Sequence, residues 1–133
     1  MSGRPSSRDI AVAAVVDGVC VVVFVALGRR SHGESGNVVA GTAKVAAPFL
    51  VGLVTGWLAA RAWRAPRTLE TALVVWPATV AVGMVLRHWA FHRGTPVSFI
   101  IVASCFTGLF LVGWRVVTTW WLARRTARSC TSA

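Results

Sequence analysis

The sequence predicts an all-α integral membrane protein, a bundle of four membrane-spanning helices with both termini on the cytoplasmic side. The chain of 133 residues is 56% hydrophobic, has a mean hydropathy of +0.67 and contains only four acidic residues. Such a composition does not fit a water-exposed surface. Four apolar runs are each long enough to cross a hydrocarbon core about 30 Å thick, which takes roughly 20 helical residues. We expect one transmembrane domain over residues 10–122, between a flexible N-terminal tail (1–9) and a basic C-terminal tail (123–133).

The first expected span covers residues 10–27 and contains Asp17 in its interior. A charge at the centre of a bilayer costs about 2.5 to 3.5 kcal/mol on insertion scales, so this carboxylate needs a partner. Arg115, in the fourth run, is the only arginine inside an apolar stretch. If the first and fourth helices are neighbours, we expect a direct or water-bridged pair with a structural role. Left unmatched, Asp17 would be a proton or cation site.

The second expected span, 45–62, carries the small-xxx-small pair Gly52 and Gly56, which lets another helix approach closely. Pro48 falls near the start of this span, where its missing N–H costs little. We expect the two glycines to serve packing within the chain, with homodimerisation as the alternative.

The third expected span, 69–86, follows Thr68, a suitable N-cap, and contains Pro77 in its middle. A proline at that position removes a backbone hydrogen bond and predicts a kink. We interpret the kink as a device for helix packing. A broken-helix substrate site of the transporter type is the alternative.

The fourth expected span, 97–122, is longer than one bilayer crossing requires, and Arg115 stands toward its end. Several tryptophans lie near the ends of the spans, where an indole ring bridges headgroups and hydrocarbon. They are Trp57, Trp63, Trp89, Trp120 and Trp121. We expect these side chains to be interfacial anchors.

Basic residues outside the spans set the expected orientation, because retained positive charge favours the cytoplasm. More of them flank the two termini and the second connection than the first and third connections. We therefore place both termini inside and expect a multi-pass protein of the plasma membrane. The net charge of +10 is concentrated at the ends of the apolar runs, which favours anionic membrane lipids as partners and predicts no binding of nucleic acid.

On the outer side, the first and third connections carry a basic patch that includes histidines. Its residues are Arg29, Arg30, His32, Arg87, His88 and His92. We expect this patch to contact phospholipid headgroups, with capture of an anionic solute as the alternative. His88 and His92 stand four residues apart, but two histidines without a carboxylate or thiolate are too few for a zinc site. Haem ligation would place histidine deeper in a span, so we expect neither a metal nor another cofactor.

Several of these residues recur in a pattern that resembles a known family. The pattern comprises Asp17, Gly28 to His32, Pro48-Phe49, Gly52, Gly56-Trp57, Gly83-Met84, Leu86-Arg87, Ser98 to Val102 and Gly113-Trp114-Arg115. It is similar to the small four-helix membrane proteins grouped as domain of unknown function 3054, over about Asp9 to Arg115. The resemblance implies the four-helix architecture, supplies no mechanism, and implies that Asp17, Arg29, His32, Arg87 and Arg115 belong to one recurring design.

Two functional hypotheses follow from the sequence. No nucleophile-base-acid set, phosphate-binding glycine loop or pair of catalytic carboxylates can be assembled from it, so we expect no enzymatic activity. The leading hypothesis is a structural or accessory membrane component that self-associates and whose basic outer patch contacts lipid or an anionic partner. The alternative is a small oligomeric transporter coupled to protons or cations through Asp17.

Overall fold

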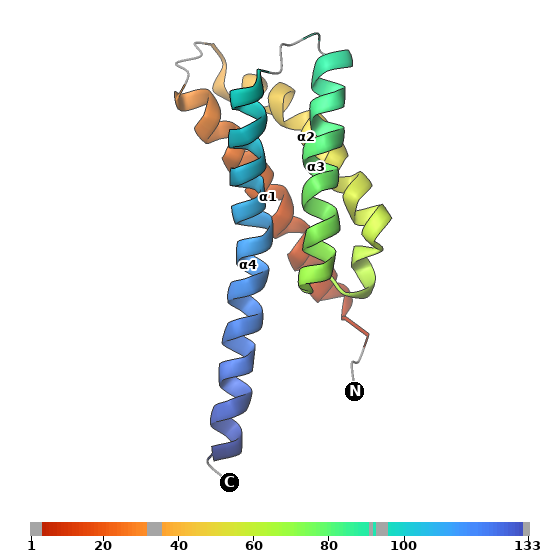
Figure 1. The fold of residues 1–133 in the computed structure, drawn as a ribbon, viewed down its shortest axis with the longest axis vertical. Helices are drawn as coiled ribbons and strands as arrows, with labels where there is room; N and C mark the ends of the chain where they lie inside the picture. The colour runs from red at the N-terminus through yellow and green to blue at the C-terminus, as the bar shows by residue number, and fades with distance from the viewer. Residues whose placement is uncertain (1–3, 32–35, 91, 93–95, 132–133) are drawn as a thin grey trace.

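The computed structural model describes residues 4–31, 36–90, 92 and 96–131. This part of the chain forms four long α-helices and one short 3-10 helix, and it contains no β-strand (Figure 1). The elements are α1 (Ser7–Ser31), α2 (Val38–Ala60), η1 (Ala62–Arg64), α3 (Leu69–Trp89) and α4 (Val97–Thr131). All four α-helices are long and apolar enough to cross a membrane. The predicted fold class, an all-α bundle of four membrane-spanning helices, is confirmed.

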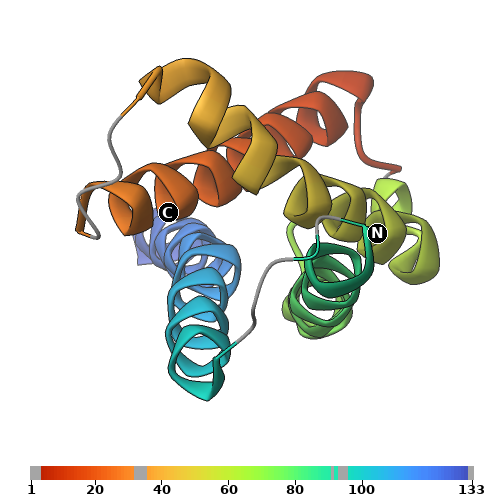
Figure 2. The same ribbon diagram turned by 90° about the horizontal axis from the view of Figure 1, so that it is seen from above.

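Successive helices run in opposite directions, which gives the bundle two different ends (Figure 1). The terminal end carries both chain termini and the α2–α3 connection, and the loop end is where α1 and α3 finish and α2 and α4 begin. Helices α3 and α4 follow the long axis of the molecule, whereas α1 crosses it diagonally. Seen from above in Figure 2, α1 and α2 lie on one side of the bundle and α3 and α4 on the other. Helix α1 packs against both α2 and α4, so its side chains reach two neighbours.

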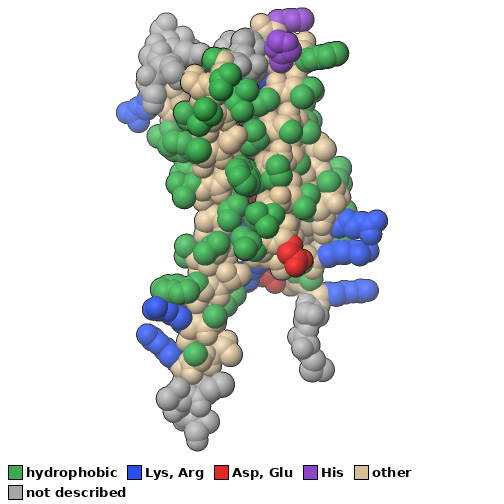
Figure 3. Space-filling view, viewed as in Figure 1, with side chains coloured by type: hydrophobic (Ala, Val, Ile, Leu, Met, Phe, Trp, Pro, Cys, Tyr) green, Lys and Arg blue, Asp and Glu red, His purple; other side chains and the backbone are tan. Residues whose placement is uncertain are grey.

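The outward surface of the helices is apolar. Only 22% to 33% of each span is buried inside the protein, and Val15, Leu58 and Leu109 are each more than 60% exposed. Figure 3 shows hydrophobic side chains along the length of the visible face, with Lys and Arg side chains mainly toward the terminal end and His side chains at the loop end. Soluble monomers rarely expose apolar patches of this extent, whereas lipid tails cover them without cost.

The tightest helix contact joins α2 to α3 through the two glycines singled out in the sequence. A Cβ atom added at Gly52 would lie 2.6 Å from the carbonyl oxygen of Thr79, and one at Gly56 would lie 3.0 Å from the Cα atom of Val75. Both glycines are buried. This face of α2 is occupied by α3, as expected for packing within the chain.

The second helix begins at Val38, seven residues before the predicted start at 45. Asn37 caps it, because its side-chain oxygen accepts hydrogen bonds from the backbone N–H groups of Val39 and Ala40 at 3.1 and 3.2 Å. The extra residues include glycine, threonine and lysine, and their low hydropathy hid the helix from a search for apolar runs. Pro48 is therefore an interior helical residue, and the placement near the helix start was wrong.

The outer helices are also longer than predicted. Helix α1 begins at Ser7, within the segment expected to be a tail, because Ser6 and Asp9 form a capping box: the Asp9 N–H donates to Ser6 Oγ at 3.2 Å, and the Ser6 N–H donates to Asp9 Oδ2 at 3.3 Å. Helix α4 continues through the expected C-terminal tail to Thr131, a length of about 52 Å at 1.5 Å per residue. Helix α3 runs unbroken through Pro77, which is exposed, so the described residues form no broken-helix site there.

Candidate functional site

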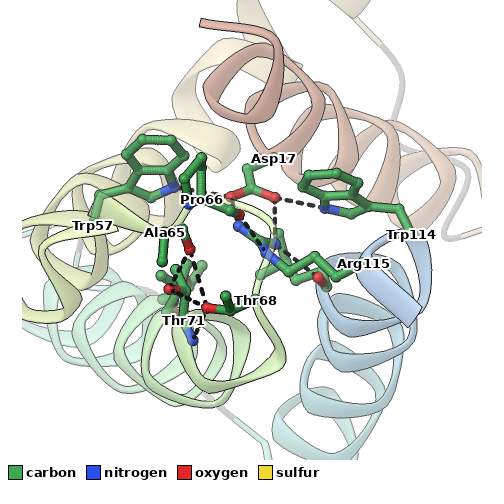
Figure 4. Close-up of polar contacts among 11 residues, drawn as sticks. Asp17, Trp57, Ala65, Pro66, Thr68, Thr71, Trp114 and Arg115 are labelled. Carbon is green, nitrogen blue, oxygen red and sulfur yellow. Dashed lines mark hydrogen bonds and ion pairs between the residues drawn. The ribbon is translucent and has the colours of Figure 1, made fainter. Parts of the chain in front are cut away.

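The buried carboxylate of Asp17 accepts four hydrogen bonds from three side chains (Figure 4). Its Oδ1 atom accepts from Trp114 Nε1 at 2.9 Å and from Arg115 Nη1 at 2.8 Å. Its Oδ2 atom accepts from Trp57 Nε1 at 2.9 Å and from Arg115 Nη2 at 2.7 Å. Each carboxylate oxygen therefore accepts one hydrogen bond from the guanidinium and one from an indole N–H.

Arg115 is as deeply buried as its partner, with both side chains 0% exposed. Besides the two parallel bonds to Asp17, its Nε donates to the carbonyl oxygen of Pro66 at 3.0 Å and its Nη1 donates to that of Leu111 at 2.8 Å. A planar guanidinium that meets a carboxylate through two parallel bonds is the strongest geometry for such a pair. The pair therefore carries no net charge, and little donor capacity remains on the guanidinium.

The α2–α3 connection is shaped so that Pro66 presents its carbonyl oxygen to Arg115. Helix α2 ends at Ala60, and the φ of 48° at its C-cap Arg61 turns the chain out of the helix. The hydroxyl of Thr71 donates to the carbonyl oxygen of Ala65 at 2.7 Å and lies 3.0 Å from the hydroxyl of Thr68. Thr68 is the N-cap of α3, as the sequence predicted. These short-range bonds fix the connection beneath the ion pair (Figure 4).

The resulting network, called here the inner lock, consists of Asp17, Arg115, Trp57, Trp114 and the Pro66 carbonyl. It joins α1, α2, α4 and the α2–α3 connection. The structure thus brings Asp17 and Arg115 into direct contact. The sequence reasoning missed both indole donors: it took Trp57 for an interfacial anchor, and it gave Trp114 no role toward the carboxylate.

A second candidate site lies at the loop end, where Arg29 from α1 and Arg87 from α3 line one cavity of about 530 Å³. The other lining residues are Phe24, Val25, Gly28, Val45, Pro96, Ser98, Phe99 and Val102. The Arg87 guanidinium lies 4.5 Å from the centre of the Phe99 ring, a cation–π contact. We call this site the outer cavity, after the outward orientation that the sequence predicts for this end.

Only part of the predicted basic patch borders the outer cavity. Arg30 and His88 are exposed on the last turns of α1 and α3 and do not line it. His92 is also exposed and has a φ of 45°. His32 lies outside the described residues. Among the residues that the structure describes, no group of three potential ligands could hold a metal ion.

The family model described as "Protein of unknown function (DUF3054)" matches residues 14–118, which is most of the chain. The protein belongs to this family, as the resemblance of its motifs indicated. The matched region includes every member of the inner lock and both arginines of the outer cavity. No curated protein and no solved structure matches the chain.

Proposed function

We propose that this member of the DUF3054 family is a non-enzymatic accessory component of the plasma membrane. In this proposal both termini lie in the cytoplasm, the inner lock holds α1, α2 and α4 to the α2–α3 connection, and the loop end faces outward and contacts anionic lipid headgroups. One observation carries the proposal: arginines from two different helices converge on one cavity at the loop end, while the intramembrane carboxylate is saturated within the chain.

The pairing of Asp17 supports a structural role for that residue over proton or cation coupling. A coupling carboxylate has to release its partner and bind the transported ion during each cycle. Asp17 would have to give up four hydrogen bonds, and its protonation would leave the Arg115 charge buried without a counter-charge, which is costly.

Ion flux into liposomes separates these two functions. We expect vesicles that contain the wild-type protein or Asp17→Asn to match empty vesicles, and we expect Asp17→Asn to lower the stability of the purified protein. Wild-type flux above the background of empty vesicles, lost in a stably folded Asp17→Asn protein, would support transport and overturn the proposal.

Lipid retention tests the proposed headgroup contact. We expect protein purified in detergent micelles that contain both phosphatidylglycerol and phosphatidylcholine to retain phosphatidylglycerol preferentially, as seen by native mass spectrometry. A basic residue near an anionic surface contributes about 1 kcal/mol, so Arg29→Gln or Arg87→Gln should each weaken the preference about fivefold. The matched control is Arg30→Gln, because Arg30 adjoins Arg29 but does not line the cavity. An equal loss in all three variants, or none in any, would contradict a role for the cavity.

The orientation is tested separately with a reporter enzyme fused after Ala133. A reporter that is active only in the cytoplasm should be active in this fusion. Activity of a periplasmic or extracellular reporter at the same position would place the loop end inside and remove the basis for outward headgroup contact.

A further inference from the structure

The lining of the outer cavity combines two chemistries. The side chains of Arg29, Arg87 and Ser98 can donate hydrogen bonds to an anion. Most of the other lining residues are apolar, among them Phe24 and Val102, and we call them the apolar wall. A site that combines cationic donors with an apolar wall is complementary to a molecule with a charged head and a hydrocarbon chain.

Each of the two arginine side chains is held in place by a neighbouring residue. Arg87 stacks on the Phe99 ring at 4.5 Å. Arg29 lies against Gly41 at the start of α2, so closely that a Cβ atom at that position would overlap its guanidinium. Glycine at position 41 is thus what lets the Arg29 side chain lie across α2. A guanidinium has a planar fork of N–H donors whose geometry matches a carboxylate or a phosphate.

The apolar wall is well packed. The ring of Phe24 meets that of Phe49 edge-on, with centroids 5.8 Å apart, and lies 6.5 Å from that of Phe99. Phe49 is completely buried and Phe24 is 4% exposed. Rings held in this way keep the wall in place instead of collapsing into the cavity, as expected for a preformed pocket.

The volume of the cavity decides between kinds of anion. At about 530 Å³, it falls within the range of roughly 300 to 1,000 Å³ that is typical of sites for organic ligands. An inorganic anion would fill a small part of it and leave the apolar wall without a partner. Burial of apolar surface at about 25 cal/mol per Å² favours a ligand that also covers this wall.

We propose that the outer cavity binds one single-chain anionic amphiphile, with its carboxylate or phosphate at Arg29 and Arg87 and the start of its hydrocarbon chain along Phe24 and Val102. This inference deepens the proposed function and rests on it, because it names the class of ligand that the loop end takes. A fatty acid and a lysophospholipid both have the required chemistry.

The experiment uses the full-length protein in phosphatidylcholine nanodiscs with nitroxide-labelled stearate, whose immobilised fraction is read by electron paramagnetic resonance. We expect saturable immobilisation of one label per protein, and at least tenfold weaker binding of the labelled methyl ester, which lacks the charge. Unlabelled oleate and lysophosphatidylglycerol should both displace the label, and inorganic phosphate should not. Stronger displacement by oleate would identify a carboxylate headgroup, and stronger displacement by lysophosphatidylglycerol would identify a phosphate headgroup. Equal binding of acid and ester, or displacement by millimolar phosphate, would overturn the proposal.

Two glycine variants on α1 form a matched pair for the site. Gly28 lines the cavity and Gly18 does not, and a Cβ atom at either position meets nothing within 4 Å. Gly28→Leu should therefore fold normally but occupy part of the cavity and reduce label binding at least tenfold, whereas Gly18→Leu should bind as the wild type does. Equal binding by the two variants would place the amphiphile elsewhere.

Failure of this inference and failure of the proposed function give different results. If Arg29→Gln and Arg87→Gln reduce retention of phosphatidylglycerol but no label is immobilised, the loop end contacts headgroups without admitting a chain. If neither variant changes lipid retention, the proposed function itself is wrong, and the ligand assignment falls with it.

Discussion

The two ends of the bundle use arginine in opposite ways. At the inner lock, Arg115 is fully buried and its guanidinium is matched by a carboxylate, two carbonyl oxygens and the face of an indole ring 4.6 Å away. At the outer cavity, Arg29 and Arg87 are only partly buried and border an open volume. The same side chain thus closes one site and leaves the other able to admit a ligand.

The difference between the two ends follows from the free-energy cost of burying a charged side chain at each position. Two charges taken out of water and lipid headgroups are stable only if their geometry is excellent and their remaining donors and acceptors are satisfied. The inner lock meets this condition within the chain, so its expected contribution is to stability and to the choice of helix neighbours. The arginines at the loop end stand near the expected headgroup level, where partial exposure lowers the cost, so their expected contribution is to binding.

Breaking the inner lock should have the largest effect. Arg115→Leu leaves the Asp17 carboxylate buried without its counter-charge, and we expect a loss of about 3 to 5 kcal/mol in the free energy of unfolding. Asp17→Leu should cost a similar amount. Unfolding by SDS in mixed micelles, followed by circular dichroism, measures both losses.

The double variant Asp17→Leu/Arg115→Leu is the control for this prediction. Replacement of a buried ion pair by apolar residues is often neutral or stabilising, so the double variant should recover most of the stability that either single variant loses. Single variants as stable as the wild-type protein would show that the lock does not hold the bundle together.

A change at one indole should have the next largest effect. Trp57→Phe removes the donor to Asp17 Oδ2 while keeping an aromatic ring, and hydrogen bonds to charged groups contribute about 1.5 to 3 kcal/mol. Trp120→Phe is the matched control, because Trp120 is 53% exposed on α4 beyond the lock, and it should change stability by less than about 0.5 kcal/mol. If the two changes reduced stability equally, Trp57 would be an interfacial anchor, as the sequence predicted.

The case of Trp57 shows where sequence reasoning reaches its limit. The number of apolar runs and the isolated charges Asp17 and Arg115 can be read from the sequence, so the four spans and the candidate pair were predictable, although the helix ends were not. The role of an indole depends on how neighbouring helices cross, and the diagonal course of α1 that brings Asp17 to Trp57 leaves no local signature. Pro66 contributes only a backbone carbonyl, a group that every residue has, so its contact with Arg115 cannot be predicted from the residue type.

At the loop end, the sequence indicated the residue types better than their grouping. Arg29 and Arg87 were predicted in one patch with Arg30 and His88, but the helices extend further than the apolar runs. Because α1 is still helical at Arg29 and Arg30, these neighbouring side chains point to different faces of the helix. Arg29 therefore reaches the cavity while the adjacent Arg30 does not.

The packing of α2 against α3 offers a smaller test. Gly52→Ala places a Cβ atom 2.6 Å from the Thr79 backbone oxygen, so α2 and α3 have to separate, and overpacking of this kind costs about 1 to 3 kcal/mol. Gly113→Ala is the control, since a Cβ atom there meets nothing within 4 Å. If Gly52 served a homodimer instead, Gly52→Ala would change the oligomer size on gel filtration and leave the unfolding of the monomer unaffected.

The smallest expected change in stability separates the two ends most clearly. Gly41→Ala introduces a Cβ atom where the Arg29 guanidinium lies, but the obstructed group is the end of a flexible side chain, which can move away. Alanine also favours the helix over glycine by about 0.5 to 1 kcal/mol, so the free energy of unfolding should rise slightly or stay unchanged.

Retention of phosphatidylglycerol by Gly41→Ala should fall, by less than the roughly fivefold loss expected for Arg29→Gln, because the charge of Arg29 remains but is displaced. Gly18→Ala, which gains the same helix propensity away from Arg29, should leave retention unchanged. A large loss of stability in Gly41→Ala would mean that Arg29 is a structural arginine like Arg115, and the contrast between the two ends would then disappear.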